Sequence, residues 1–110
     1  MSIVVTPEEL GEALTRFGYA FLVSVGEDGR PKIVSVNVAL AGGTLIVTDT
    51  GRGARANVAA RPGVTLVWPP ADPRDLSLIL DGEASLLPDA IAVPAGRAIL
   101  HRPAPAPVTP

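Results

Sequence analysis

Cysteine is absent from the sequence, and histidine and lysine occur once each, as His101 and Lys32. Without cysteine the chain forms no disulfide and has neither a thiolate nucleophile nor a cysteine-ligated zinc. A single histidine argues against a histidine metal site and against a hydrolytic triad. The acidic residues are scattered, and no two of them have the spacing of a paired-carboxylate site.

Strong net charge and long apolar runs are also missing. The formal net charge is −2, so the chain lacks the basic surface that attracts nucleic acid. No apolar run approaches the roughly 20 residues that a membrane helix requires. The N-terminus has neither the basic nor the apolar region of a signal peptide. We therefore expect a cytoplasmic protein whose partners include neither nucleic acid nor a membrane.

What is present indicates one folded domain. The chain has 110 residues, of which 47% are hydrophobic, so it is long enough for one core and too apolar to be disordered. We place a single domain at residues 1–101. Alternating prolines in residues 102–110 favour extended polyproline conformation, and we expect a proline-rich tail there.

The first predicted element is a short helix. Thr6 is suited to the N-cap, Pro7 to the first helical position, and Glu9 completes a capping box. Apolar residues follow at helical spacing as far as Phe17, and Gly18 suits the end of the helix.

Five segments are rich in β-branched and apolar residues and are predicted to be strands: 19–25, 32–40, 44–48, 64–68 and 76–86. Turn residues at 26–29 join the first two as a hairpin. Gly82 inside the last strand favours a bulge or bend. A further short helix is expected at 94–100. This pattern predicts a mainly β fold, a small antiparallel barrel.

The predicted strand at 32–40 has two unlike faces. One face is apolar and is expected to join the core through Val34, Val36, Val38 and Leu40. The other face is small and partly polar, with Ile33, Ser35, Asn37 and Ala39. Such a face suits a ligand or a subunit partner, and it equally suits an ordinary exposed surface.

The segment after the third strand combines helix-capping residues with glycine and arginine. Residues 48–50, Thr-Asp-Thr, are suited to cap a helix predicted at 54–61. The Gly-Arg-Gly sequence at 51–53 lets backbone amides approach a ligand closely. A helix N-terminus beside Arg52 attracts anions, so the segment is a candidate phosphate cradle. An ordinary solvated turn explains the same residues.

Four stretches, in this order and spacing, resemble the pyridoxamine 5′-phosphate oxidase-like family, the flavin-binding split barrels. They are Phe-Leu-Val-Ser-Val at 21–25, Asp-Gly-Arg-Pro at 28–31, Asn-Val-Ala-Ala-Arg-Pro at 57–62 and Asp-Gly-Glu-Ala at 81–84. The resemblance implies a six-stranded, antiparallel, Greek-key-like split barrel. It also implies a homodimer with the cofactor in a groove between the subunits.

The cofactor that the resemblance implies is FMN, with deazaflavin F420 in some branches and haem in a few members. Matched by position, the cofactor-binding residues are Lys32, Ser35, Asn37, Thr48, Thr50, Arg52 and Arg55. The serine and the asparagine correspond to positions near the isoalloxazine ring. The others belong to the segment that holds the phosphate or supply charge beside it.

The sequence departs from the family at two helix positions. FMN-binding members usually carry lysine or arginine where this chain has Ala54, and often another where it has Ala56. Each charge-assisted bond lost from a dianionic phosphate weakens binding by about 1.5–3 kcal/mol. Family members of ordinary length also add a helix and a strand at the C-terminus.

Two functions follow from the resemblance. The first is an FMN- or F420-dependent oxidoreductase with a small-molecule substrate, in which the cofactor carries the hydride. No side chain is an obvious acid or base catalyst. The alternative is a non-catalytic dimeric module that has lost flavin phosphate binding and takes a small molecule, haem or a protein partner. A third interpretation is a truncated relative of the family that binds no cofactor.

Overall fold

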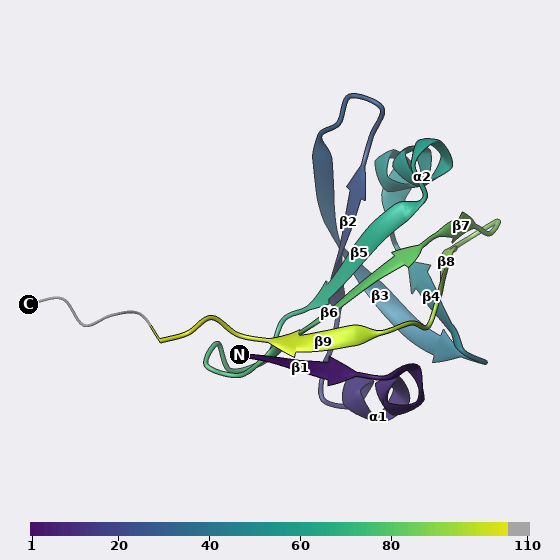
Figure 1. Cartoon of the computed structure of the whole chain (residues 1–110). Coiled ribbons are helices and arrows are strands. Elements are labelled where there is room, and N and C mark those ends of the chain that lie inside the picture. The colour runs from purple at the N-terminus through teal and green to yellow at the C-terminus, as the bar shows by residue number, and fades with distance from the viewer. Residues whose placement is uncertain (106–110) are drawn as a thin grey trace, which may run out of the picture.

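The structure, a computed structural model, describes residues 1–105, which contain one antiparallel sheet of nine strands and three short helical segments. The strands follow the order β1-β9-β6-β5-β2-β3-β4-β8-β7 across the sheet (Figure 1). Their bounds are β1 Ser2–Val5, β2 Ala20–Val25, β3 Pro31–Ala41, β4 Thr44–Thr48, β5 Gly63–Trp68, β6 Ser77–Glu83, β7 Ser85–Leu86, β8 Ile91–Pro94 and β9 Ala98–His101. The helical segments are η1 Pro7–Glu9, α1 Leu10–Leu14 and α2 Gly51–Ala60.

Two bent strands close this sheet into a barrel. β7 continues β6 after a bend at Ala84, and β9 follows β8 after a bend at residues 95–97. β6 pairs with β5 and β9, whereas β7 pairs with β8. The outermost strand of the linear order is therefore the continuation of an inner strand, as closure requires. The mainly β, antiparallel barrel predicted from the sequence is confirmed.

Gly82 lies just before the bend, as its position in the sequence predicts. A Cβ atom built on it would lie 2.7 Å from Val93 Cγ1 of β8. Only glycine allows β6 to approach β8 this closely. At the bend itself the Ala84 N–H donates to the Pro62 carbonyl at 2.8 Å, which secures the turn of the chain.

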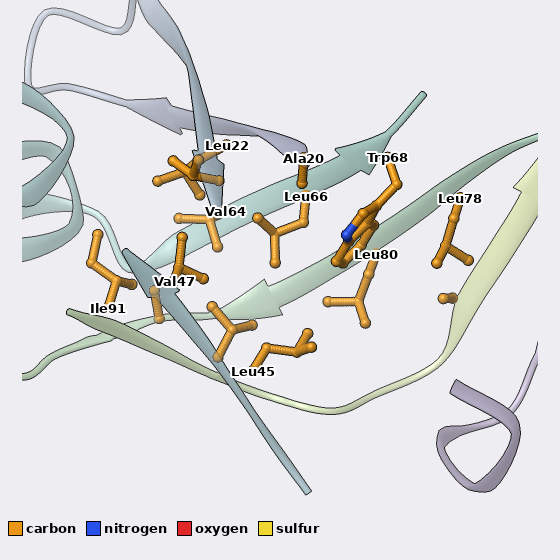
Figure 2. Close-up of a cluster of buried hydrophobic side chains, with 14 of the residues drawn as sticks. Ala20, Leu22, Leu45, Val47, Val64, Leu66, Trp68, Leu78, Leu80 and Ile91 are labelled. Carbon is orange, nitrogen blue, oxygen red and sulfur yellow. The ribbon is translucent and has the colours of Figure 1, made fainter. Parts of the chain in front are cut away.

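The core fills the barrel between its walls. Leu22, Leu66 and Leu80 are aligned across β2, β5 and β6, and each is at most 1% exposed. Trp68 is also fully buried. Figure 2 shows side chains of the facing wall directed at this cluster, including Leu45, Val47 and Ile91.

The N-terminal helix begins as predicted but ends earlier. The Thr6 N–H donates to Glu9 Oε1 at 3.0 Å, so the predicted capping box is confirmed. Its first turn is a 3₁₀ turn, and α1 ends at Leu14. Phe17 follows in a turn and its N–H bonds the Leu14 carbonyl at 3.1 Å.

Glu9 makes the stability of this helix start depend on pH. Hydrogen bonds from Thr6 hold the pKa of the Glu9 carboxyl below its ordinary value of 4.5. The bond from the Thr6 backbone N–H has the larger effect and the bond from its side chain the smaller one. A lowered folded-state pKa stabilises the fold above the ordinary value, and this contribution is lost as the pH falls through the folded-state pKa. We therefore expect Glu9→Gln to flatten the loss of stability towards acid pH, measured as urea midpoints at about pH 6 and about pH 3. The neighbouring Glu8→Gln is the control, and equal acid dependence in both variants would contradict the expectation.

The C-terminal third differs from the sequence predictions. The helix predicted at 94–100 is wrong, because β8 ends at Pro94 and β9 begins at Ala98. β9 is hydrogen-bonded to β6 on one side and to β1 on the other, so tertiary pairing outweighs local helix preference. β1 itself was not predicted, and the strand predicted at 76–86 is divided at the Ala84 bend.

The expected domain and tail boundaries remain predictions. Residues 106–110 of the proline-rich segment lie outside the described residues. None of the helices within residues 1–105 combines the length and the apolar character that crossing a membrane requires.

Candidate functional site

β3 presents the two faces that the sequence predicts. The inward face packs against or within the core through Val34, Val36 and Val38. On the outward face Ile33 is 62% exposed, and Ser35 and Asn37 are exposed beside it. Leu40, at the far end of the inward face, is 36% exposed and is the exception to the expected burial.

Asn37 is oriented by the end of the neighbouring strand. Its Nδ2 donates to Asp49 Oδ2 at 2.8 Å, and its ladder partner is Thr48. Asp49 has a φ of 63°, in the left-handed region that aspartate tolerates better than most residues. This backbone bend and the side-chain bond together fix a polar group on the outward face of β3.

α2 begins earlier than predicted, at Gly51 instead of residue 54. Arg52 and Gly53 therefore belong to its first turn and not to a turn before it. Thr50 is the N-cap residue and is buried, but its side chain makes no capping hydrogen bond. The predicted side-chain cap is thus wrong at the N-cap, and Asp49, another of the three predicted capping residues, accepts a hydrogen bond from Asn37 of β3.

Lys32 lies against the first turn of α2. A Cβ atom built on Gly53 would lie 2.7 Å from Lys32 Cε and 3.1 Å from Lys32 Nζ. The glycine therefore leaves the space that the lysine side chain fills. Arg52 precedes this glycine and is exposed. The open N–H groups of this helix N-terminus therefore have Lys32 against them and Arg52 in the same turn.

These cations have no acidic partner in the described part of the chain. Among residues 1–105 the ion pair within 4.0 Å is Arg74–Asp72, at 2.8 Å. Lys32 and Arg52 consequently have no carboxylate of residues 1–105 within that distance. Two positive side chains held beside the positive end of a helix dipole attract anions.

A buried polar bond sets the distance between Lys32 and α2. Ser24 is 1% exposed and is the ladder partner of Lys32. Its Oγ accepts a hydrogen bond from Asn57 Nδ2 of α2 at 3.1 Å. The bond holds the β2–β3 hairpin against the helix, so Asn57 positions the lysine from a distance. The sequence marked Asn57 only through the family resemblance, and nothing in it identified Ser24 as the partner.

Arg55 is directed to another part of the barrel. Its Nη1 donates to the Ala90 carbonyl at 3.0 Å and its Nη2 to the Leu87 carbonyl at 2.7 Å. These bonds join α2 to the connection between β7 and β8. The structure therefore does not bring Arg55 together with Lys32, and a cofactor role for Arg55 would require both bonds to break.

Of the seven residues matched to cofactor binding, five thus form two groups and two stand apart. Lys32 lies against the first turn of α2, to which Arg52 belongs, and Ser35 and Asn37 share the outward face of β3 with Thr48 at its edge. Thr50 is buried beneath the helix start, and Arg55 faces the β7–β8 connection. Two open hollows, of about 390 and 460 Å³, lie elsewhere and include none of the seven.

A profile described as pyridoxamine 5′-phosphate oxidase matches residues 6–101. The chain belongs to this family. Among known proteins, the uncharacterized protein Mb0449c of Mycobacterium bovis is 37% identical over 111 residues, which cover 86% of this chain and 78% of that protein. The resemblance inferred from the four short stretches is therefore confirmed.

Solved structures related to this family member share its fold at low sequence identity. The FAD-binding protein from Mycobacterium smegmatis has a TM-score of 0.64 and 17% identity, and the match covers 91% of this chain and 97% of the M. smegmatis chain. An F420 reductase has a TM-score of 0.53 and 23% identity, and the match covers 81% of this chain and 87% of the reductase chain. At these identities the likeness establishes the split-barrel fold.

The two helix positions that depart from the family differ in their surroundings. Ala54 is fully buried against the core, whereas Ala56 is exposed. In this member of the pyridoxamine 5′-phosphate oxidase family, the cations at the start of α2 are Arg52 and Lys32, which comes from β3.

Proposed function

We propose that this chain binds a flavin or deazaflavin cofactor and acts as an oxidoreductase. The observation that carries the proposal is the placement of Lys32 against Gly53 at the start of α2, with no carboxylate partner within residues 1–105. A phosphate placed there would meet Lys32, Arg52 and free backbone N–H groups. Charge-assisted bonds of this kind contribute about 1.5–3 kcal/mol each.

The outward face of β3 fits the ring of such a cofactor. Ser35 and Asn37 are short polar residues that let a flat ring approach, and Asp49 fixes the asparagine amide. The ladder partner of Ser35 is Phe21, whose ring meets Tyr19 edge to face at 5.4 Å. Small polar groups beside an aromatic pair suit a conjugated ring with polar edges.

A second copy of the chain would complete this site. Tyr19 is 51% exposed and Ile33 is 62% exposed, on the same hairpin as Ser35 and Asn37. Exposed apolar side chains gathered around polar ones are typical of subunit interfaces. We propose a homodimer in which the partner covers this face and encloses the ring.

The cofactor would supply the hydride chemistry when bound. The residues of the chain would bind and orient it: Lys32 and Arg52 at its phosphate, and Ser35 and Asn37 along its ring. The dimer partner would exclude water from the face of β3. The small-molecule substrate would enter the same groove.

The two similar solved structures support this choice of cofactor class. One is named as an FAD-binding protein and the other as an F420 reductase. FMN is our first candidate and F420 the second, because the dianionic phosphate monoester of FMN matches two cations at the start of α2, whereas the phosphodiester of F420 carries one negative charge.

An absorption spectrum of the purified protein, followed by titration with FMN, F420 and riboflavin, tests the proposal. We expect FMN or F420 to bind and riboflavin, which lacks the phosphate, to bind at least about tenfold more weakly. Light scattering should give twice the mass of one chain. A colourless protein that takes up none of the three ligands would refute the proposal.

A non-catalytic binding module is the second candidate. The exposed Ala56 favours this candidate, because it is neutral at a position where family members that bind FMN often carry a cation. A dimer that binds no flavin or deazaflavin but binds haem or another small molecule would support this candidate instead.

Gly53→Ala should separate cofactor binding from folding. The added Cβ would meet Lys32 Cε at 2.7 Å, and the flexible lysine would have to move. Alanine favours helix over glycine by about 1 kcal/mol, so thermal stability should hold or rise. We expect FMN affinity to fall about tenfold, the loss of one charge-assisted bond, as measured by fluorescence titration.

Gly11→Ala is the matched control for this variant. It is also a helical glycine, but its added Cβ would lie 3.6 Å from Leu40 Cδ2, an ordinary contact. Equal FMN affinities for the two variants would contradict the placement of the phosphate beside Lys32.

A further inference from the structure

A hollow of about 390 Å³ lies where the chain after α1, the β5–β6 loop and the end of β9 meet. In Figure 1 this loop lies beside the N-terminus and the end of β9. The lining contributed by these three segments includes Arg16, Phe17, Asp75, Leu76, Leu100 and Arg102. None of them belongs to the site proposed for the cofactor.

The floor of the hollow is apolar and is attached to the core. Phe17 and Leu100 pack against the buried core cluster, and Leu76 is half-buried. A floor anchored in this way keeps its shape and offers a surface from which an apolar ligand can exclude water. The volume lies within the range of roughly 300–1,000 Å³ that is usual for small-molecule pockets.

The rim of the hollow is cationic. Arg102 Nη1 donates to the Arg74 carbonyl at 3.1 Å, which holds this guanidinium against the β5–β6 loop. Within residues 1–105 neither Arg16 nor Arg102 has a carboxylate within 4.0 Å, since the ion pair there is formed by Arg74 and Asp72. Asp75 is the acidic residue of the lining, to which Arg16, Arg102 and the ammonium of Met1 contribute three positive charges.

We infer that this hollow binds an amphipathic organic anion, a carboxylate or sulfonate attached to an apolar or aromatic body. The body covers Phe17, Leu76 and Leu100, and the anionic group meets Arg16 and Arg102. A neutral molecule of the same shape gains only the apolar contact. This selectivity for charge distinguishes the site from a non-specific hydrophobic surface.

Anilinonaphthalene sulfonate and its neutral analogue phenylnaphthylamine are a matched pair of fluorescent probes. We expect the full chain to bind the sulfonate with one site per chain and to bind the neutral probe more weakly. Octanoate should displace the sulfonate, and octylamine should not. Amide chemical shifts of Leu76 and Leu100 should move on binding, whereas those of Ser35 and Asn37 should not. Shifts confined to β3 would overturn the inference.

Charge variants then test the rim in both directions. Arg16→Gln and Arg102→Gln should each weaken sulfonate binding up to about fivefold, as expected for a solvent-exposed charge pair, and leave the neutral probe unchanged. Asp75→Asn should tighten sulfonate binding and leave the neutral probe unchanged, whereas apolar surface exposed by damage to the fold would raise the binding of both probes. Arg97→Gln, an exposed arginine outside the hollow, is the control. Unchanged sulfonate affinity in all three rim variants would overturn the inference.

Discussion

Replacing Lys32 and Arg52 together by glutamine is expected to weaken FMN binding about a hundredfold or more. Each side chain supplies one charge-assisted bond to the phosphate, and each such bond contributes at least about 1.5 kcal/mol. Because 1.4 kcal/mol corresponds to a factor of ten, each single variant should lose about tenfold. Both side chains are exposed in one subunit, which is why we take the lower end of the range.

Titration of the purified variants with FMN and with riboflavin makes this test. The loss should be confined to FMN, since riboflavin has no phosphate for the two cations to hold. Arg61→Gln is the matched control, because Arg61 is an exposed arginine at the opposite end of the same helix. The same loss of FMN affinity in Arg61→Gln would show that only the overall charge matters. An unchanged FMN affinity in the double variant would show that the phosphate does not bind beside Lys32 and Arg52.

Leu66→Ala is expected to destabilise the fold by about 3–5 kcal/mol, the range for a leucine truncated in a packed core. Leu66 is 0% exposed and lies in the middle of β5, between Leu22 of β2 and Leu80 of β6 (Figure 2). No neighbouring strand can close the resulting cavity, because each is fixed by its ladder. Small domains have about 5–15 kcal/mol of stability in total, so a large share would be lost.

Thermal and urea unfolding measure this effect against Leu86→Ala. Leu86 is also a strand leucine, in β7, but it is 42% exposed. For this size of protein we expect Leu66→Ala to lower the melting temperature by about 15 °C or more, and Leu86→Ala by only a few degrees. Equal losses would mean that the barrel interior is not packed around the row of three leucines.

Local patterns predicted those parts of the fold that depend on neighbouring residues. The capping box at Thr6 and Glu9 follows from their spacing, and the hydrogen bond between them confirms it. The two faces of β3 follow from alternation, because successive side chains in a strand point to opposite sides. Gly82 was marked by its position inside a strand, and its contact with Val93 explains it.

Local patterns failed where pairing partners decide the structure. The segment from Ile91 to His101 reads as short apolar pieces separated by proline and glycine. It becomes two strands because β4, β6, β7 and β1 offer free edges to it. α2 likewise begins early, at Gly51, whose φ of 79° a glycine adopts without strain, and the left-handed residue before it, Asp49, is not specified by the sequence.

The sequence by itself determined the family, the barrel class and the outward position of Ser35 and Asn37, because these follow from residue order and from the two-residue period of a strand. Only the tertiary structure decided which cations lie at the start of α2. Lys32 reaches Gly53, and Arg55 turns away to the Leu87 and Ala90 carbonyls. The physical reason is that the Asn57–Ser24 bond and the packing of α2 on the barrel set these distances, and such contacts join residues far apart in the chain.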